Sequence, residues 1–590
     1  MEAAGGGRRA GPTARRAVII GVALALAAVP ASCGQGPKPE AATRGGGASA
    51  TTTEAATTTT AAPTGGSLVV EARTEARLTD NFNPFDTAST LSQLGAPAYI
   101  YEPLVQYDEL AVDQYYPWLA QSWSFSDSGF TITFDLRSGV KWDDGSPFTA
   151  SDVAYTFDLL KMYPAINDGV PIVSAVATNS LTFVLTLSQP GYAYMYDIAR
   201  TPIVKAGYAS GRAPEAFVDT KPDGTGPYVL ADSGFSASRV VLTARSGYWQ
   251  RGEPAISELV FPAYPDAAAV MSALQKGTLD WAATELPDVQ SAYVDKDASA
   301  NHYWAPPVDS ISLELNLARA PMGELAVRRA ISDAIDRDAL SLQTGGGFDP
   351  PATSASGLVL PTDAQFLSSS DTGDIDGAGD PALSALVMRA SGYHRGKLGY
   401  WVDKAGQVVR LSIEDPAGSA FAAEAVLVAR QLHVAGFDAS ASTVPAGRWR
   451  ANLAAGDFSA SVLASASGPS PFYMYQAWLD PALIARGHAT GDYEKLDAAT
   501  NARLAAKVSA DLSDYTDSLS DSAGAQSAIE SLAAIVNEYL PVVPLLYGVA
   551  WGAFSTRHVT GWPASQDPYE PAIPKAPFSE YTVLQLGPSP

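Results

Sequence analysis

The chain has 590 residues, of which 46% are hydrophobic, and its formal net charge of −24 makes it strongly acidic. This length exceeds what one hydrophobic core usually supports, so two or three domains are expected. Nucleic acid and anionic lipid are both bound through basic side chains, so the acidity disfavours both as partners. Solubility alone is a sufficient explanation for the size of the charge.

The N-terminus has the pattern of a secretory signal. Four arginines lie within the first 16 residues and precede an apolar run at residues 17–29. This run is too short for a membrane-spanning helix, which needs about 20 residues, and suits the apolar core of a signal peptide. We therefore predict a signal peptide at 1–32. Its removal takes away four Arg and one Glu and shifts the net charge from −24 to −27.

Cys33 is the single cysteine of the chain, so no internal disulfide is possible. It follows the small residues Ala31 and Ser32 at the end of the apolar run, which is typical of the lipid acceptor site of a lipoprotein. Pro30 stands where bacterial lipoproteins usually have leucine, and an incidental cysteine is the alternative. We expect lipidation of Cys33 to anchor the protein to the outer face of the cell membrane.

Residues 33–66 are predicted to form a disordered linker. They consist mainly of Thr, Ala, Gly and Pro, a composition that cannot offset the entropy lost on ordering. Flexible-coil scaling gives the linker a root-mean-square reach of about 30 Å. The folded body is therefore expected to stay beside the membrane and to turn freely.

Residues 117–158 predict a β-hairpin followed by a capped helix. Four apolar residues alternate with polar ones at the two-residue period of a half-buried strand: Phe130, Ile132, Phe134 and Leu136. Trp123 keeps the same period before a turn at residues 126–129, which ends in glycine. Thr149 and Asp152 then have the spacing of a capping box ahead of a helical pattern.

The sequence of this segment, with LAQSW, TFDLRSGVKW and FTASDVAYTF, resembles the signature of the family 5 extracellular solute-binding proteins. These are the oligopeptide, dipeptide and nickel receptors of ABC importers. Further segments resemble the family in the same order: the Asn-Pro loop at 81–85, GTGPY at 224–228, AVRRAISDAIDRDAL at 326–340, and residues 385–414 and 540–547. The resemblance covers nearly all of the chain between residues 67 and 550.

The resemblance implies an α/β fold of two lobes around a cleft, the large class II form of the periplasmic-binding-protein-like fold, with an extra subdomain inserted in lobe one. Chain order then assigns three separate stretches to lobe one, at 67–110, 221–310 and 551–590. The inserted subdomain is expected at 111–220 and lobe two at 311–550.

Local signals predict further elements of these lobes. A strand is expected at 311–317, and amphipathic helices at 325–340 and 421–435. Asp266 is expected to cap a helix over 267–276, which the following glycine ends.

Sequence motifs give no indication of an enzyme. HExxH, Walker, GxSxG and cysteine-cluster motifs are all absent from the sequence. The five histidines have no metal-ligand spacing: His302, His394, His433, His488 and His558. Asp143 and Asp144 have the residue types of an acid and base pair, but adjacent carboxylates in a turn are usually solvated. A Ser/His/Asp triad stays open, because its members need not be close in sequence. No cofactor or metal is expected.

The segment at 464–478 is expected to form a ligand-binding loop. Peptide-binding members of the family commonly carry an acidic residue here that pairs with the peptide ammonium, whereas this chain has none before Asp480. A buried ammonium without its carboxylate costs about 3 kcal/mol or more. A neutral, stackable solute such as an oligosaccharide or a blocked peptide is therefore favoured. Alternatively, Asp480 or an acid on the other lobe serves the amine.

The sequence thus predicts a monomeric, membrane-tethered receptor that closes two lobes over a small extracellular solute and delivers it to an ABC permease with its ATPase. The expected ligand contacts come from both lobes: Asn81, Phe82 and Asn83 from lobe one, and Phe472, Tyr473, Tyr475 and Trp478 from lobe two. A secreted hydrolase of cell-surface polymers is the second hypothesis. A receptor fold reused as a sensor or scaffold is the third.

Overall fold

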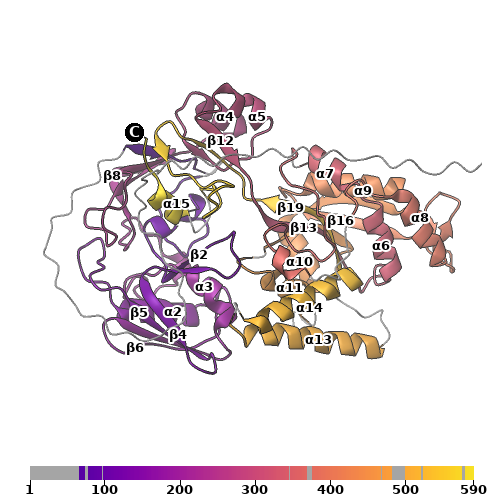
Figure 1. Cartoon of the computed structure of the whole chain (residues 1–590), viewed down its shortest axis with the longest axis horizontal. Helices are drawn as coiled ribbons and strands as arrows, with labels where there is room; N and C mark the ends of the chain where they lie inside the picture. The colour runs from indigo at the N-terminus through magenta and orange to yellow at the C-terminus, as the bar shows by residue number, and fades with distance from the viewer. Residues whose placement is uncertain are drawn as a thin grey trace, which may run out of the picture. The chain divides into compact units, whose positions relative to one another are not determined.

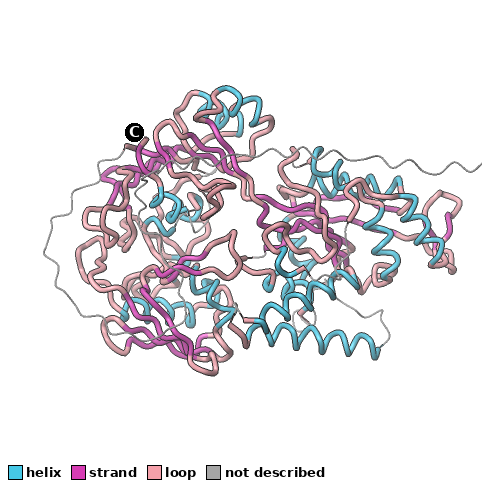
Figure 2. Tube along the Cα trace, viewed as in Figure 1, coloured by secondary structure: helices cyan, strands magenta, loops and turns pink. Residues whose placement is uncertain are grey.

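The structure is a computed structural model. It describes residues 66–72, 77–95, 97–344, 346–367, 375–466, 468–480, 498–519, 522–574 and 579–589. The predicted signal peptide, Cys33 and the linker up to residue 65 lie outside these ranges. Helices and strands alternate along the described chain, so the protein is of the mixed α/β class (Figures 1 and 2).

The first strand of the body belongs to a four-stranded sheet. Its order is β1 (Ser67–Val69), β10 (Glu258–Pro262), β9 (Arg239–Ala244) and β8 (Tyr228–Ser236). β1 and β10 are parallel, with Leu68 opposite Leu259, while the other neighbours are antiparallel. Apolar side chains of all four strands are buried in one core cluster with Phe82 and Trp281.

A second sheet joins the C-terminal part of the chain to this region. It has the order β11 (Trp281–Ala282), β20 (Gly552–Ser555) and β12 (Asn301–Trp304), and both pairings are antiparallel. The pairing places residues 552–555 beside two strands that chain order also assigns to lobe one. The domain boundaries themselves stay predictions.

Short helices accompany these two sheets: α1 (Thr90–Gln93), α4 (Ala267–Gln275), α5 (Val289–Ala292) and α15 (Ser579–Gln585). A two-stranded pair, β21 (Val559–Thr560) with β22 (Gly587–Pro588), lies near the C-terminus. The predicted cap of α4 is confirmed, because Asp266 accepts a hydrogen bond from the Ala269 N–H at 2.8 Å. Gly277 has φ +67° and follows the helix as predicted.

The predicted hairpin at residues 120–136 is confirmed. β4 (Ala120–Phe125) and β5 (Thr131–Leu136) are antiparallel neighbours. Together with β7 (Thr182–Leu187) and β6 (Ile172–Ala177) they form a four-stranded sheet in the order β4-β5-β7-β6. Gly129 in the turn has φ +72°. The prediction for Phe130 is wrong: it is 40% exposed, because it precedes β5 at the turn and its side chain is not covered by the sheet's buried face.

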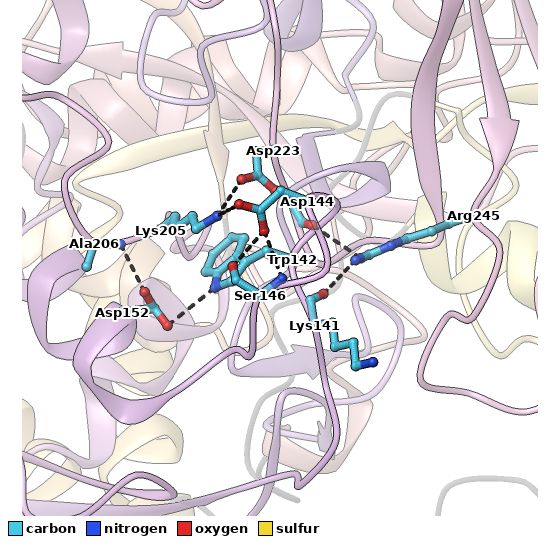
Figure 3. A network of polar contacts seen from close by, with 10 residues as sticks. Lys141, Trp142, Asp144, Ser146, Asp152, Lys205, Ala206, Asp223 and Arg245 are labelled. Carbon is cyan, nitrogen blue, oxygen red and sulfur yellow. Dashed lines mark hydrogen bonds and ion pairs between the residues drawn. The ribbon is translucent and has the colours of Figure 1, made fainter. Parts of the chain in front are cut away.

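The predicted capped helix is α2 (Ala150–Met162), and α3 (Met195–Ala199) follows the sheet. Asp152 accepts a hydrogen bond from the Thr149 N–H at 2.8 Å, so the acidic residue of the predicted capping box contacts the N-cap. The same carboxylate also accepts from the Ala206 N–H at 3.0 Å and the Trp142 Nε1–H at 3.3 Å (Figure 3). Asp152 therefore joins the start of α2 to two other segments.

The turn at residues 141–146 is held by charged side chains from outside it (Figure 3). Lys205 donates to Asp144 and, at 2.8 Å, to Asp223. Arg245 donates to the Lys141 carbonyl at 2.7 Å. The Lys205 ammonium, by its hydrogen bond, holds the pKa of Asp144 below its usual range. Asp144 thus has a structural ion-pair role in place of the acid or base role considered from the sequence.

A five-stranded sheet forms the centre of the region predicted as lobe two. Its order is β17 (Asp438–Val444), β16 (Arg410–Pro416), β18 (Ala460–Ala466), β13 (Pro307–Leu315) and β19 (Val542–Val549). β16 is parallel to β17 and β18, whereas β13 is antiparallel to β18 and β19. A small hairpin pairs β14 (His394–Arg395) with β15 (Trp401–Val402).

Helices of this region pack in two core clusters, one of which includes the five-stranded sheet. They are α6 (Leu325–Asp333), α7 (Arg337–Gln343), α8 (Pro381–Ala390), α9 (Ala422–Val434), α11 (Phe472–Leu479), α13 (Ala498–Thr516) and α14 (Ala523–Tyr539). A further helix, α10 (Ala446–Ala455), has no buried residue. α13 and α14 lie side by side (Figure 1). α9 confirms the helix predicted at 421–435.

Two predictions about this region are wrong. The helix expected over 325–340 is two helices, because Asp336 caps α7 through the Ala339 N–H at 2.8 Å and starts a new helix there. The segment at 464–478 is mostly regular structure, since its first residues belong to β18 and its aromatic residues to α11. The apolar side chains of α11 are buried, which explains why they form a helix and no open loop.

Candidate functional site

The three residues predicted to contact a ligand from lobe one form hydrogen bonds and packing contacts within the protein. Asn81 accepts from the Asp219 N–H at 3.0 Å, and Asn83 donates to the Pro214 and Phe217 carbonyls at 2.6 Å each. Phe82 is fully buried and packs edge-on against Phe235, with 6.1 Å between ring centroids. These side chains fix the loop at 81–85 against residues 214–219.

The four aromatic residues predicted from lobe two lie on α11 and pack among its neighbours. Phe472 stacks on Tyr515 with 4.3 Å between ring centroids. The Tyr475 hydroxyl donates to the Ser356 carbonyl at 3.1 Å, and Trp478 Nε1–H donates to Glu314 at 3.2 Å.

Tyr473 differs from the other three, because it contacts the segment that the sequence assigns to the inserted subdomain. Its hydroxyl donates to the Ala193 carbonyl, and its ring lies 5.0 Å from that of Tyr196. The structure therefore places the two predicted groups in separate core clusters, around Phe82 and around Trp478. Their role as ligand contacts stays a prediction.

A loop that the sequence analysis did not identify contacts the residues just before α11. The hairpin β2 (Val105–Tyr107) and β3 (Tyr115–Pro117) carries this loop at residues 108–114. The Asp113 N–H donates to the Pro469 carbonyl at 2.7 Å. The Tyr515 hydroxyl lies 2.9 Å from the Asp113 carboxylate and 2.7 Å from the Ser470 hydroxyl. Segments predicted for different lobes thus form direct polar contacts here.

A small cavity lies at this junction. Its walls come from the hairpin loop, from the start of β13, from residues 359–363 and from the turn before α11. The lining residues are Glu109, Val112, Val308, Val359, Thr362, Asp363, Gly468 and Pro469. Its free volume of about 10 Å³ is enough for about one water molecule and lies far below the range of about 300–1,000 Å³ typical of small-molecule pockets.

Two carboxylates line the cavity. Glu109 Oε2 is buried without a hydrogen-bond partner, and Asp363 is 4% exposed and accepts from the Val359 N–H at 2.9 Å. Burial raises the pKa of Glu109 to about 8, to which the charges of Asp309 and Asp108 contribute. Burial likewise raises the pKa of Asp363 to about 7. Both carboxyl groups therefore favour their neutral form in this environment.

Two more acids lie next to Glu109. Burial raises the pKa of Asp108 to about 6, although the Leu110 N–H and the Tyr116 hydroxyl lower it in part. Glu570 is fully buried, and neither of its oxygens has a partner with normal hydrogen-bond geometry. Burial raises its pKa well above the ordinary value, the charges of Asp108 and Glu109 raise it further, and the Glu109 N–H offsets this in part.

Sequence reasoning missed these acids because they are distant in the chain. Glu109, Asp363 and Glu570 come from three separate segments, and none belongs to a motif. One signal was present: Asp108 and Glu109 are adjacent acids that follow the apolar residues 104–105 after a gap of two residues. A charged pair beside such a run indicates either a solvated turn or a buried polar site, and the sequence alone does not separate the two.

The described residues contain neither a cluster of metal ligands nor a membrane-spanning helix. Within the ranges given above, no group of three or more His, Cys, Asp or Glu side chains is arranged to hold a metal ion. Nor does any helix in those ranges have the length and apolar character needed to cross a membrane.

Residues 114–483 match the family model of the bacterial extracellular solute-binding proteins, family 5. This match covers more than half of the chain. The chain belongs to this family. Family 5 membership confirms the resemblance drawn from the hairpin and the capped helix.

Curated relatives include two proteins of Escherichia coli K12. The nickel-binding periplasmic protein is 30% identical over 260 residues, which cover 42% of this chain and 49% of that protein. The dipeptide-binding protein is 29% identical over 350 residues, which cover 54% of this chain and 62% of that protein. The chain thus matches between about half and three fifths of the length of these relatives.

Solved structures of the family share the fold of this chain. An oligopeptide-binding protein of Thermotoga maritima with bound mannohexaose has a TM-score of 0.70 at 23% identity, covering 89% of this chain and 99% of that one. The oligopeptide-binding protein AppA of Bacillus subtilis with a nonapeptide has a TM-score of 0.65 at 18% identity, covering 90% and 100%. The predicted two-lobe α/β fold is therefore confirmed.

Proposed function

We propose that this family 5 protein is the extracytoplasmic receptor of an ABC importer and that it captures a peptide or a related small solute between its two lobes. Family membership carries the proposal, because the relatives and structural neighbours described above are named as binding proteins. Their ligands differ widely, from a dipeptide and a nonapeptide to mannohexaose. The relatives therefore do not distinguish among these kinds of small solute for this chain.

Closure of the lobes is the mechanism that we propose for capture. The polar contacts of Asp113 with Pro469 and Tyr515, and of Tyr473 with Ala193, join segments predicted for different lobes. Such contacts would hold the closed state and break on opening. A permease that recognises the closed form would then accept only loaded receptors.

A second part of the proposal concerns location. Lipidation of Cys33 would hold the receptor beside its permease and ATPase at the outer face of the membrane, with residues 33–66 as the linker. Mass spectrometry of the protein from its native membrane tests this, because a diacylglyceryl group adds a defined mass to the peptide that begins at Cys33. Release of Cys33→Ala into the medium is the expected result, and equal membrane retention of both proteins would contradict it.

Native mass spectrometry of the purified protein, followed by thermal-shift measurements, tests the receptor function. A ligand that binds only the folded state stabilises it and so raises the melting temperature. At a free ligand concentration of one hundred times Kd, the stabilisation is about 2.7 kcal/mol. A receptor returns the solute intact, whereas a hydrolase converts it. Recovery of a cleaved product after incubation would contradict the proposal.

A further inference from the structure

The C-terminal helix α15 buries a carboxyl group that the proposed receptor function does not use. Glu580 lies at the start of α15 and is fully buried. The next residue, Tyr581, packs in the same core cluster as Phe134 of β5, whereas Val583 packs in the cluster around Phe82. α15 therefore joins two hydrophobic cores of the protein, and it brings a titratable group between them.

A second fully buried carboxyl group, that of Glu102, faces Glu580. Its oxygen Oε1 accepts three hydrogen bonds, from Trp118 Nε1–H at 3.0 Å, the Tyr248 hydroxyl at 2.6 Å and Trp249 Nε1–H at 2.9 Å. Donors that converge on one carboxyl oxygen favour the charged form of the group. Glu102 is therefore the charged member of the pair.

The oxygens that remain lack a donor. Gln106 Nε2–H donates to Glu580 Oε2 at 2.9 Å, but Glu580 Oε1 and Glu102 Oε2 are buried without a hydrogen-bond partner among the described residues. The Thr225 hydroxyl lies near Glu102, yet it does not have normal hydrogen-bond geometry. The two carboxyl groups lie within hydrogen-bonding reach of each other. Two charged groups there would repel, whereas one proton between them gives a charge-assisted hydrogen bond.

We propose that this proton resides on Glu580 Oε1, is donated to Glu102 Oε2, and locks α15 into the body of the protein, so that α15 detaches as the pH rises. Detachment would expose the side chains by which α15 joins the two cores. The lock is separate from the proposed receptor function, so the failure of either leaves the other standing.

The charges around the pair agree with this position of the proton. Burial raises the pKa of Glu580 well above its ordinary value, and the charge of Glu102 raises it further. Burial also raises the pKa of Glu102, but the hydrogen bonds of Tyr248 and Trp249 and the charge of Arg245 lower it. Glu102 is thus the stronger acid of the two.

Five further titratable side chains interact with the pair: Tyr99, Arg137, Tyr228, Arg245 and Tyr248. Burial raises the pKa of all three tyrosines far above neutral pH, so they stay uncharged in the range of the test. The arginines stay charged in that range. Of these groups and the pair itself, Glu580 is therefore the one that titrates when α15 detaches.

The sign of the pH dependence follows from proton linkage. The docked helix holds the proton of Glu580 more tightly than the detached helix, in which a solvated glutamate has its ordinary pKa of 4.5. Above this pH each detachment releases one proton, so the equilibrium constant of detachment rises about tenfold per pH unit until docked Glu580 itself ionises. Hydrogen exchange of the α15 amides, divided by the intrinsic rate at each pH, measures this constant.

Glu580→Gln is the test variant in the full chain. Glutamine keeps the oxygen that accepts from Gln106, and its N–H₂ group donates to Glu102 without a titrating proton. We expect the detachment constant of the natural protein, relative to that of Glu580→Gln, to rise about 100-fold between pH 6 and pH 8. The amides of α9 are the internal control. Asp127→Asn, which removes an exposed turn carboxylate, is the control variant and should follow the natural protein.

Parallel curves for α15 in the natural protein and in Glu580→Gln overturn the proposal, because docking would then bind no proton at Glu580. An equal difference in α9 overturns the local detachment. Unfolding of Glu580→Gln at pH 6 also counts against the lock, since a permanent donor at this position should keep α15 docked. Glu102→Gln gives a second measurement: it should detach more readily than the natural protein at pH 6, and unchanged exchange would contradict the charge on Glu102.

Discussion

Glu314 provides a direct test of how burial sets the pH dependence of this protein. The residue lies in β13, is 9% exposed, and accepts a hydrogen bond from Trp478 Nε1–H at 3.2 Å. Burial raises the pKa of Glu314 from 4.5 to about 7, although the Trp478 hydrogen bond opposes the rise. We predict that Glu314→Gln removes the cost of charging this buried group.

The magnitude follows from the linkage between protonation and folding. The folded protein holds the proton of Glu314 more tightly than the unfolded chain, so its contribution to stability is full below pH 4.5 and is lost as the pH rises to about 7. Each tenfold change in a protonation equilibrium is worth about 1.4 kcal/mol, so the total loss is about 3 kcal/mol. Glutamine keeps an oxygen that accepts from Trp478 and has no such loss.

Thermal unfolding between pH 5 and pH 8 is the assay. For a folded region of roughly 150–250 residues, such as the predicted lobe two, about 3 kcal/mol corresponds to a melting-temperature change on the order of 6–12 °C. Glu314→Gln should therefore lose that much less stability than the natural protein over this range, whereas Asp127→Asn should follow the natural protein. Parallel curves for Glu314→Gln and the natural protein would refute the reasoning, because they would show that Glu314 is charged without cost.

Three other substitutions test the local structure by thermal or urea unfolding. Trp478→Phe removes the donor to Glu314, so its destabilisation should be larger at pH 8 than at pH 5; a pH-independent loss would contradict this. Asp152→Ala should cost about 1–2 kcal/mol, because the helix cap is lost; an unchanged midpoint would contradict the role of the cap. Gly129→Ala should cost about 1–2 kcal/mol more than Gly139→Ala. Both glycines have positive φ, but only at Gly129 would a Cβ meet a side chain, at 2.7 Å; equal costs would contradict the clash.

Local signals were sufficient to predict much of the fold. The hairpin at 120–136, the cap of α2 at Asp152 and the cap of α4 at Asp266 each depend on residues within a few positions of one another. The errors arose where a long-range contact or a neighbouring cap decided the outcome. Phe130 satisfies the strand period but lies outside the sheet's buried face, and Asp336 interrupts a continuous helical pattern by capping α7.

The candidate site was harder to predict, because its residues meet only in the folded chain. The aromatic residues of α11 have the composition of a ligand-binding wall, yet burial against Tyr515 and Glu314 gives Phe472 and Trp478 a packing role that no local pattern distinguishes from binding. Glu109 and Asp363 show the converse. Each is an ordinary acid in sequence, and only the shared cavity gives them a common environment.

The absence of an acid between residues 464 and 478 therefore has a different meaning in the folded protein than in the sequence. The acids counted along one segment are only those close in sequence, whereas the electrostatic potential in a cavity depends on every charge around it. Glu109 and Asp363 illustrate this, because they come from segments far from residue 464 and far from each other in the chain, yet they line one cavity in the folded protein. A buried amine needs a carboxylate at its own position in space, so a segment without acids does not by itself exclude an amine from the ligand.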